Sequence, residues 1–198
     1  MKKGLLIALG VIAGLVLLFL LYVGGIYNRL VSAEEGVKSA WAQVENVYQR
    51  RLDLVPNLVE TVKGYAAHER QTLQGVVDAR SKISQMNISS GVINDPDTLA
   101  KFQALQGQLS SAISRLLVVV EQYPDLKASQ NFLALQTQLE GTENRISVER
   151  GRFNEVSQAF NTLRRVFPNV LVASAMGLKE KAYFRADEAA PKAPAIKF

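Results

Sequence analysis

A run of apolar residues between Phe132 and Phe167 limits the folds open to this chain. Positions spaced alternately by three and four residues form the run, and nine of its eleven members are large and apolar. The members are Phe132, Leu135, Leu139, Thr142, Ile146, Glu149, Phe153, Val156, Phe160, Leu163 and Phe167. This spacing is typical of a helix that buries one narrow seam against partner helices. One helix cannot bury its own seam, so we expect the rest of the chain to supply helices that lie along it.

The N-terminus predicts a membrane span. Gly4 to Ile26 contains no charged residue, and as a helix it would extend roughly 34 Å, enough to cross a hydrocarbon core of about 30 Å. The run is longer than the apolar core of a cleavable signal peptide, and no A-x-A cleavage site follows it. We therefore expect an uncleaved, single-pass signal-anchor over residues 1–26. Lys2 and Lys3 favour a cytoplasmic N-terminus, which would place the main domain on the non-cytoplasmic side.

Two glycines inside the span predict helix–helix association. Gly10 and Gly14 form a G-x-x-x-G pattern, a spacing that lets two membrane helices approach closely and dimerise. Glycine is also common in membrane helices that do not associate. The hypothesis that follows is a homo-oligomer joined through the Gly10/Gly14 face.

The chain beyond the span continues as helix. Apolar residues keep three–four spacing from Leu30 to Val55, with no breaker between them, so the membrane helix is expected to run directly into the first helix of the domain. Pro56 is expected to end that helix, because proline removes a backbone donor and clashes with the preceding turn. Asp53 would then cap a second helix over Pro56–Gln85.

Turn residues divide the rest into two further helices. Asn87–Asp95 predicts a loop, and Asp95-Pro96 predicts a helix start with aspartate as cap. That third helix is expected to end at Tyr123-Pro124, and Asp125 to cap the long fourth helix. Short connections between long helices make neighbours antiparallel. The predicted fold is all-α: a transmembrane helix that continues into an elongated antiparallel bundle of about four long helices (27–186), followed by a flexible tail (187–198).

Two charged residues fall on the apolar seams. Arg51 lies on the seam of the first helix and Glu149 on that of the fourth. A charge in a packed interior is costly unless it is paired, so we expect Arg51 and Glu149 to form a buried ion pair, with Glu143 or Arg145 contributing. Such a pair would set the register of the bundle, and a functional role is the alternative.

Two turn-like clusters are candidates for a partner surface. Asp53 and Asn57 flank Pro56, while Tyr123, Asp125 and Lys127 surround Pro124. Clusters of this kind form partner-binding corners in some proteins and are capped helix turns in others. We expect both at the membrane-distal end of the bundle.

Composition excludes several kinds of chemistry. The chain has no cysteine and one histidine, His68, which excludes disulfides, thiol catalysis and Cys- or His-rich metal centres within one chain. No G-x-S-x-G, Walker or H-E-x-x-H motif occurs, so we expect no catalytic, cofactor-binding or metal-binding residues and no enzymatic activity. The 23 basic and 18 acidic residues are mixed along the chain, which argues against a nucleic-acid partner.

Three stretches resemble the LemA family of bacterial membrane proteins. They are RRLDLVPNLVETVKGYAAHE from Arg50 to Glu69, EQYPDLKASQNFLALQTQLEGTENRI from Glu121 to Ile146, and the FP pair at Phe167-Pro168. The resemblance implies a bacterial inner-membrane location, a single N-terminal anchor and a helical bundle. It implies no catalytic motif and carries no site residues onto this chain. One branch of the family, the MamQ-like proteins, is associated with magnetosome membranes, which points to membrane organisation.

Two functions from different classes fit these features, and both have the lipid bilayer as a partner. The first is a scaffold whose bundles form homo-oligomers and organise or shape the membrane. The alternative is an adaptor that binds another membrane or envelope protein for signalling or quality control. A scaffold should form large assemblies when purified alone, and an adaptor should not.

Overall fold

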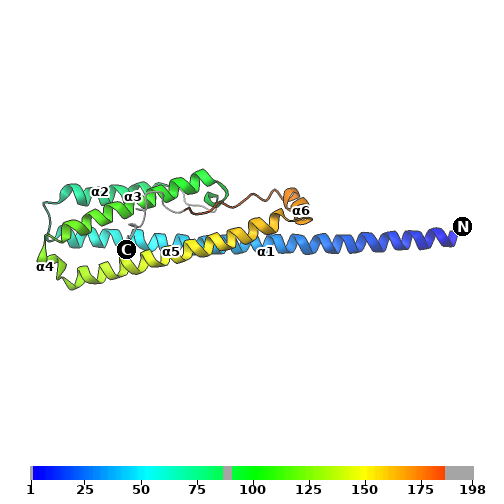
Figure 1. Cartoon of the computed structure of the whole chain (residues 1–198), viewed down its shortest axis with the longest axis horizontal. Coiled ribbons are helices and arrows are strands. Elements are labelled where there is room, and N and C mark those ends of the chain that lie inside the picture. Colours follow the sequence, from blue (N-terminus) through cyan, green and yellow to red (C-terminus); the bar gives the residue numbers. More distant parts are fainter. Residues whose placement is uncertain (1, 87–90, 186–198) are drawn as a thin grey trace, which may run out of the picture.

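One helix, α1 (Lys2–Lys63), runs the length of the molecule (Figure 1). The computed structural model describes residues 2–86 and 91–185. The 62 residues of α1 contain both the uncharged N-terminal stretch and the first helix of the bundle. Gly24 and Gly25 do not interrupt it. From Ile26 onward one side of α1 is buried, in a seam that includes Leu30, Val37, Trp41, Val44, Tyr48 and Val55. The predicted continuity between the N-terminal helix and the bundle is confirmed.

Three further long helices pack along α1. They are α2 (Arg70–Ser84), α3 (Pro96–Val120) and α5 (Gln130–Arg165), and three short elements lie between or after them: η1 (Val92–Asn94), α4 (Pro124–Lys127) and α6 (Asn169–Ala175). Consecutive long helices run in opposite directions (Figure 1). α5 lies against α1, and α2 lies against both α1 and α3. The all-α, elongated antiparallel bundle of four long helices is therefore confirmed.

The expected break at Pro56 is wrong. Pro56 lies inside α1, which continues to Lys63, so Asp53 does not cap a second helix and α2 begins at Arg70 rather than Pro56. Proline at this position deprives the Leu52 carbonyl, four residues earlier, of its usual N–H donor. Arg80 of α2 supplies the missing bond: its Nε donates to the Leu52 oxygen at 3.0 Å. The helix persists because a neighbouring helix satisfies the carbonyl that proline leaves free.

The turn before the fourth long helix also differs from expectation. α3 begins as predicted: the Asp95 carboxylate accepts a hydrogen bond from the Asp97 backbone N–H, with proline in the first turn. α3 ends at Val120, and Asp125 lies in the first turn of the short helix α4 instead of capping α5. α5 begins later, at Gln130.

The core has two main parts along the bundle axis. The part far from the N-terminus is mainly aliphatic and includes Leu58, Val76 and Leu116, all fully buried. The other part surrounds Trp41, whose ring lies 5.8 Å from that of Phe102 and 5.5 Å from that of Phe153, between centroids. Edge-to-face pairs of this kind contribute specific packing beyond the area they bury. Aromatic packing therefore sets the geometry of the half nearer the membrane helix.

The predicted seam of the fourth helix is buried over most of its length, with one exception. Phe132, Leu139, Ile146, Phe153 and Phe160 are each no more than 5% exposed. Phe167 is 81% exposed, because α5 ends at Arg165. The residue before a proline disfavours helical backbone, which accounts for the end of α5 just before the Phe167-Pro168 pair. The prediction that Phe167 belongs to the buried seam is therefore wrong.

After α6 the chain turns back along the bundle in extended form. Residues 178–185 lie beside α5 and contact η1 through a hydrogen bond from the Ala182 N–H to the Ile93 carbonyl (2.8 Å). Phe184 and Ala182 contribute side chains to the aromatic part of the core. The predicted tail, residues 187–198, lies outside the described residues, as does the part of the predicted loop at residues 87–90.

Candidate functional site

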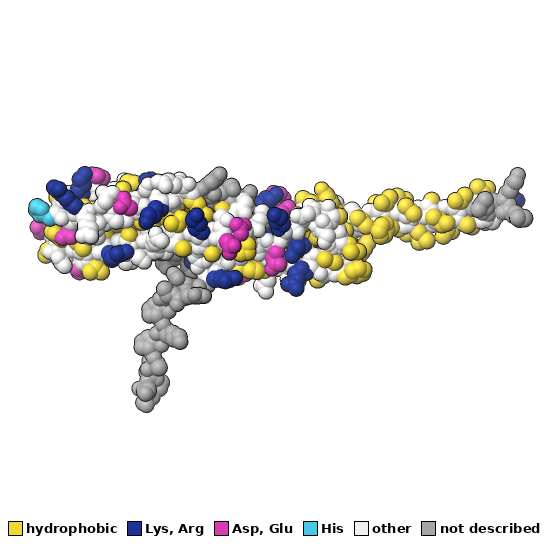
Figure 2. Space-filling model, turned by 90° about the horizontal axis from the view of Figure 1, so that it is seen from above, with side chains coloured by type: hydrophobic (Ala, Val, Ile, Leu, Met, Phe, Trp, Pro, Cys, Tyr) yellow, Lys and Arg dark blue, Asp and Glu magenta, His cyan; other side chains and the backbone are white. Residues whose placement is uncertain are grey.

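The part of α1 that precedes Ile26 extends beyond the bundle as an apolar helix, which we name the arm. It is yellow in Figure 2. Its large side chains from Leu6 to Tyr22 are between 52% and 69% exposed. Within the described chain this is the one helix long and apolar enough to cross a membrane, with a mean hydropathy of 2.9 over its most apolar 18 residues. An apolar helix without protein around it requires lipid or another apolar helix as its environment. The arm makes this a membrane-associated protein.

Gly10 and Gly14 lie one turn apart on the same face of the arm. A Cβ atom added at either glycine would meet no heavy atom within 4 Å. Neither glycine is therefore required by packing inside the described part of the chain. Their role in helix association stays a prediction.

Arg51 is buried between three helices, at 2% exposure. Its Nη2 donates to the Gln106 carbonyl (3.2 Å) and to the Ser110 hydroxyl (2.5 Å) on α3. Its Nε lies 3.1 Å from Glu143 Oε1 on α5, close enough for an ion pair but without hydrogen-bond alignment. Burial lowers the pKa of Arg51 below its ordinary value, while Glu143 opposes that shift. A guanidinium nevertheless remains charged at neutral pH, so the group joins α1, α3 and α5 as a fixed cation.

The expected partner of Arg51 is corrected by this geometry. Arg51 pairs with Glu143, and Glu149 forms no ion pair within the described residues. Glu149 is half-buried, and its Oε2 has no hydrogen-bond partner among them. Glu143 and Glu149 are six residues apart on α5, about 9 Å along the helix axis. The alignment of α1 with α5 brings the nearer of the two carboxylates to Arg51.

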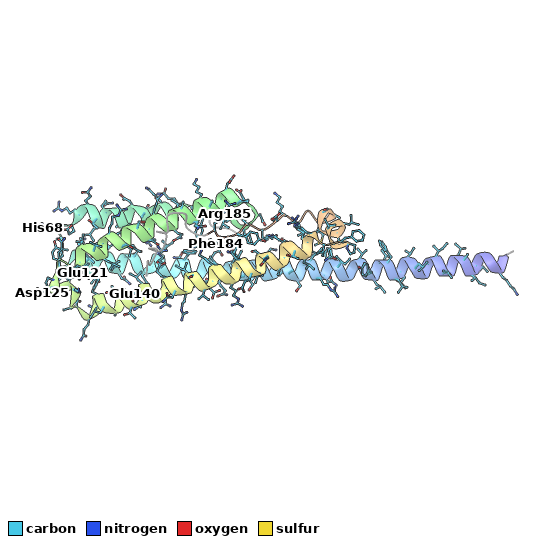
Figure 3. All side chains as sticks on the ribbon, viewed as in Figure 1. His68, Glu121, Asp125, Glu140, Phe184 and Arg185 are labelled. Carbon is cyan, nitrogen blue, oxygen red and sulfur yellow. The ribbon has the colours of Figure 1, made fainter. Side chains whose placement is uncertain are left out.

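The two expected partner corners are in different local structures. Tyr123 lies at the α3–α4 turn, where its hydroxyl donates to Glu69 Oε1 at 3.1 Å and so joins this turn to the start of α2. Asp125 is exposed there, and Lys127 pairs with Glu121. Figure 3 labels Glu121 and Asp125 at the end of the bundle opposite the arm.

Asp53 and Asn57 do not form a turn. Both are exposed residues inside α1, and the Asp53 carboxylate accepts a hydrogen bond from Gln49 Nε2 (2.7 Å). The Asn57 carbonyl accepts one from the Thr61 hydroxyl (2.8 Å). The corner expected at Asp53 and Asn57 is therefore an uninterrupted helix surface, since Pro56 does not break α1.

A row of α5 side chains holds the extended segment 178–185 by its backbone. Asn161 donates to the Lys181 carbonyl and accepts from the Lys181 N–H, both at 2.9 Å. Asn154 makes the same pair of bonds with Phe184, again at 2.9 Å. Gln103 of α3 donates to the carbonyl of Arg185 at 2.8 Å. Because an amide side chain offers one donor and one acceptor, each asparagine replaces the neighbouring strand that an extended backbone otherwise needs.

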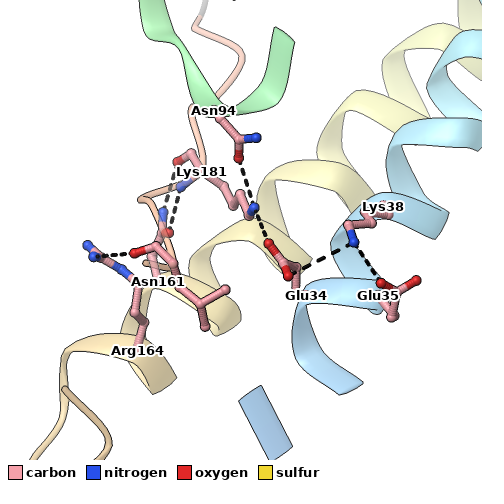
Figure 4. A network of polar contacts seen from close by, with 8 residues as sticks. Glu34, Glu35, Lys38, Asn94, Asn161, Arg164 and Lys181 are labelled. Atoms are coloured by element: carbon pink, nitrogen blue, oxygen red, sulfur yellow. Dashed lines mark hydrogen bonds and ion pairs between the residues drawn. The ribbon is translucent and has the colours of Figure 1, made fainter. Parts of the chain in front are cut away.

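Lys181 is the charged centre of this contact (Figure 4). Its side chain is 2% exposed, and its ammonium donates to Glu34 Oε1 and to Asn94 Oδ1, each at 2.8 Å. The ammonium also lies 5.1 Å from the centroid of the Phe160 ring. Glu34 occupies a seam position of α1, so this pair links α1, η1 and the extended segment. A buried ammonium without such partners would be costly.

The asparagine row was not predicted, although the sequence contains its signal. Phe153-Asn154 and Phe160-Asn161 are identical dipeptides seven residues apart. Both phenylalanines are fully buried, and the asparagine after each one bonds to the extended segment. A repeat of seven residues returns to nearly the same helix face. The two asparagines therefore bind the extended backbone at Lys181 and at Phe184.

Comparison with known proteins gives one family. A family model described as the LemA family matches residues 40–198. Protein LemA of Metamycoplasma hominis is 27% identical over 180 residues, which cover 87% of this chain and 78% of that protein. Magnetosome protein MamQ of Magnetospirillum gryphiswaldense is 26% identical over 174 residues, and Magnetosome protein MamQ 2 of Paramagnetospirillum magneticum is 27% identical over 175 residues. Each of these two matches covers 80% of this chain but 64% of the relative, so the chain spans less than two thirds of the MamQ proteins.

Proposed function

Because this chain belongs to the LemA family, we propose that it is a non-enzymatic, single-pass scaffold of the bacterial inner membrane. Its bundles self-associate and thereby organise or shape that membrane. The observation that carries the proposal is the continuity of α1 from the apolar arm into the bundle. In a scaffold the arrangement of the membrane helices has to determine the arrangement of the bundles. An unbroken helix joins the two rigidly.

The mechanics of α1 support this proposal. A flexible linker would let the bundle rotate freely above its anchor, whereas an α-helix held by side-chain packing is stiff. Packing of α1 begins at Ile26 and Leu30, directly after the arm. A contact between two arms would therefore fix the angle between two bundles, and repetition of that angle would build an ordered array.

The arm supplies a surface for self-association. Gly10 and Gly14 are open on one face, and small residues with this spacing allow close helix approach in membranes. Relatives named as magnetosome proteins support a role in a membrane compartment. The bundle is placed on the non-cytoplasmic side by the same proposal, on the positive-inside rule applied to Lys2 and Lys3. Protease added to intact cells stripped of any outer membrane should digest the bundle; full protection would refute this topology.

The polar end of the bundle favours a second function, an adaptor for another envelope protein. Asp125 is exposed at the end opposite the arm (Figure 3), and Lys127, two residues later in α4, is also exposed. In this function the bundle is a spacer that presents its α3–α4 turn to a partner at a fixed distance from the membrane. Such a protein need not associate with itself.

Particle size distinguishes the two functions. The full-length protein is extracted in mild detergent and imaged without any partner. We expect large, closed assemblies, and we expect Gly10→Leu with Gly14→Leu to reduce them to small particles because the added side chains separate the arms. Ala8→Leu is the matched control, since Ala8 lies on roughly the opposite face of the arm and is also exposed.

Uniform monomers of the unaltered protein would refute the scaffold and leave the adaptor. Assemblies that persist in the glycine variant would show that self-association uses another surface. Far-UV circular dichroism of each variant establishes that helix content is unchanged.

A further inference from the structure

Four apolar side chains are exposed together where α5 gives way to α6. Val166, Phe167, Val170 and Leu171, which we name the apolar tip, are 46%, 81%, 37% and 63% exposed. Elsewhere on the described bundle, exposed large apolar side chains are spread along the chain: Tyr27, Tyr65, Val77, Val118, Leu133, Val148 and Tyr183. Single exposed apolar residues are ordinary, whereas a group of four within six positions indicates a contact surface.

The apolar tip lies where the arm leaves the bundle. α6 packs on α1 through Ala173, which is 1% exposed and lies in one cluster with Ile26 and Leu30. Ile26 lies near the end of the uncharged stretch, which begins at Gly4 and ends at Asn28, just before Arg29. Figure 1 shows α6 beside α1 at the end of the bundle from which the free arm extends. The tip is thus level with the point where α1 would emerge from the hydrocarbon.

Charged and aromatic residues around the tip match a membrane interface. Arg165 and Lys179 flank the tip in sequence, while Arg164 pairs with Glu180 at 3.5 Å. Arg165 precedes the tip, and Arg29 is exposed on α1 one turn after Ile26. Tyr22 and Tyr27 are 58% and 48% exposed on the same part of α1. Tyrosine at the headgroup level and arginine near lipid phosphates are typical of residues at this depth.

We propose that the apolar tip is a second membrane contact, inserted into the boundary between headgroups and acyl chains of the leaflet from which α1 emerges. Phe167 and Leu171 enter the apolar side of that boundary, while Arg29 and Arg165 contact lipid phosphates. This contact rests on membrane association but not on self-association of the chain. The arm alone would leave the bundle free to rotate about the axis of α1. A second contact beside that axis, at the tip, fixes this rotation and the tilt of the bundle on the membrane.

The surroundings favour lipid over a second copy as the occupant. The tip lies at the base of the arm, whose exposed apolar helix is long enough to cross a membrane. Short apolar segments flanked by cations lie in the interface plane and do not span the bilayer. A loop tip of this kind also occupies area in one leaflet only, which would bend the membrane that the bundle stands on.

The test uses the absence of cysteine in the chain. Phe167→Cys and Leu171→Cys are each labelled with an environment-sensitive fluorophore in the full-length protein. Val148→Cys is the matched control, because Val148 is 66% exposed on the middle of α5. Each protein is placed, one copy per disc, in nanodiscs of phosphatidylethanolamine and phosphatidylglycerol. Brominated phospholipid and aqueous iodide then quench the fluorophore from the lipid and from the water.

We expect bromolipid to quench the two tip probes and not the Val148 probe. Iodide quenching of the tip probes should be at least about tenfold weaker than at Val148, the shift expected from burying one large apolar side chain. Tip probes as accessible to iodide as the Val148 probe would overturn the proposal. Protection from both quenchers that arises only with several copies per disc would also overturn it, because a second copy would then cover the tip. Since single-copy discs contain no oligomer, this result is independent of the scaffold function.

Discussion

Replacing Pro56 tests whether Arg80 keeps α1 intact. Proline in a helix interior costs about 3 kcal/mol relative to alanine, part of it through the carbonyl left without a donor. In this protein the Leu52 carbonyl receives Arg80 Nε at 3.0 Å, and Leu52 is 5% exposed. Pro56 itself is exposed, so its replacement leaves the core unchanged. The two residues should therefore be energetically coupled although 24 positions separate them in the printed sequence.

The magnitudes follow from the hydrogen bond and its alternative donor. Pro56→Ala should stabilise the fold by about 1–2 kcal/mol, less than the full helix penalty because Arg80 already satisfies the carbonyl. Arg80→Ala in the unaltered chain should cost about 2–3 kcal/mol, since it removes the bond and leaves a buried carbonyl unpaired. In the Pro56→Ala background the same change should cost only about 0.5–1 kcal/mol, because the new N–H at position 56 donates to Leu52. The expected coupling is about 1–2 kcal/mol.

Urea unfolding of the four proteins of this double-mutant cycle measures the coupling. The full-length chain in detergent micelles is followed by the fluorescence of Trp41, which is 1% exposed and is the one tryptophan of the chain. Circular dichroism at the same urea concentrations checks that both halves of the core unfold together. Lys82→Ala is the matched control: it removes a cation from the exposed face of α2 and should change stability by less than about 0.5 kcal/mol. Equal costs of Arg80→Ala in both backgrounds would refute the reasoning, because the bond to Leu52 would then have no relation to proline.

Changes at three further residues test other parts of the structure. Asn161→Ala should destabilise the chain by about 2–3 kcal/mol, because both backbone groups of Lys181 lose their partner; hydrogen exchange at the Lys181 amide checks this, and unchanged protection would contradict it. Arg51→Ala should lower the free energy of unfolding in urea by about 2–4 kcal/mol. Arg51→Met should lower it by less than about 1.5 kcal/mol, because methionine keeps the apolar stem and half-exposed Glu143 returns to water. Equal costs of the two changes would show that the charge of Arg51 itself matters. Hydrogen bonds from Thr98 and from the Asp97 N–H lower the pKa of Asp95 below its usual 3.8. The Asp95 carboxylate therefore stabilises the fold at higher pH, and this contribution is lost as pH falls through the lowered pKa. Asp95→Asn should make the free energy of unfolding depend less on pH in the acid range, and an unchanged dependence would contradict the assignment.

Arg51 shows which part of a buried ion pair can be predicted from the sequence. Three–four spacing places Arg51 on the seam of α1 and identifies it as a residue that needs a partner when buried. Spacing does not identify the partner, because Glu143 and Glu149 both lie on α5, less than two turns apart. The axial alignment of the two helices selects Glu143, 3.1 Å from Arg51 Nε. The aromatic core around Trp41, in which Phe153 of α5 packs on Trp41 of α1, contributes to that alignment.

The continuation of α1 through Pro56 depends on a contact that local rules do not contain. Proline, aspartate and asparagine together favour a helix end, which is why a break was expected. The side chain of Arg80 is distant in sequence, and only the antiparallel return of α2 brings it to Leu52. Tertiary structure here outweighs a local preference of a few kcal/mol.

The sequence by itself determined that the chain forms long amphipathic helices, because the 3.6-residue period of an apolar face is a local property that each segment carries. It did not determine the end of α1 or the starts of α2 and α5. It also determined the uncharged arm, the Asp95 cap and the absence of cysteine chemistry. Only the tertiary structure decided how residues 178–185 are held and where the apolar tip lies. An extended segment has no period of its own to mark its partners, and its backbone donors and acceptors are satisfied by side chains of α5 that folding alone brings alongside.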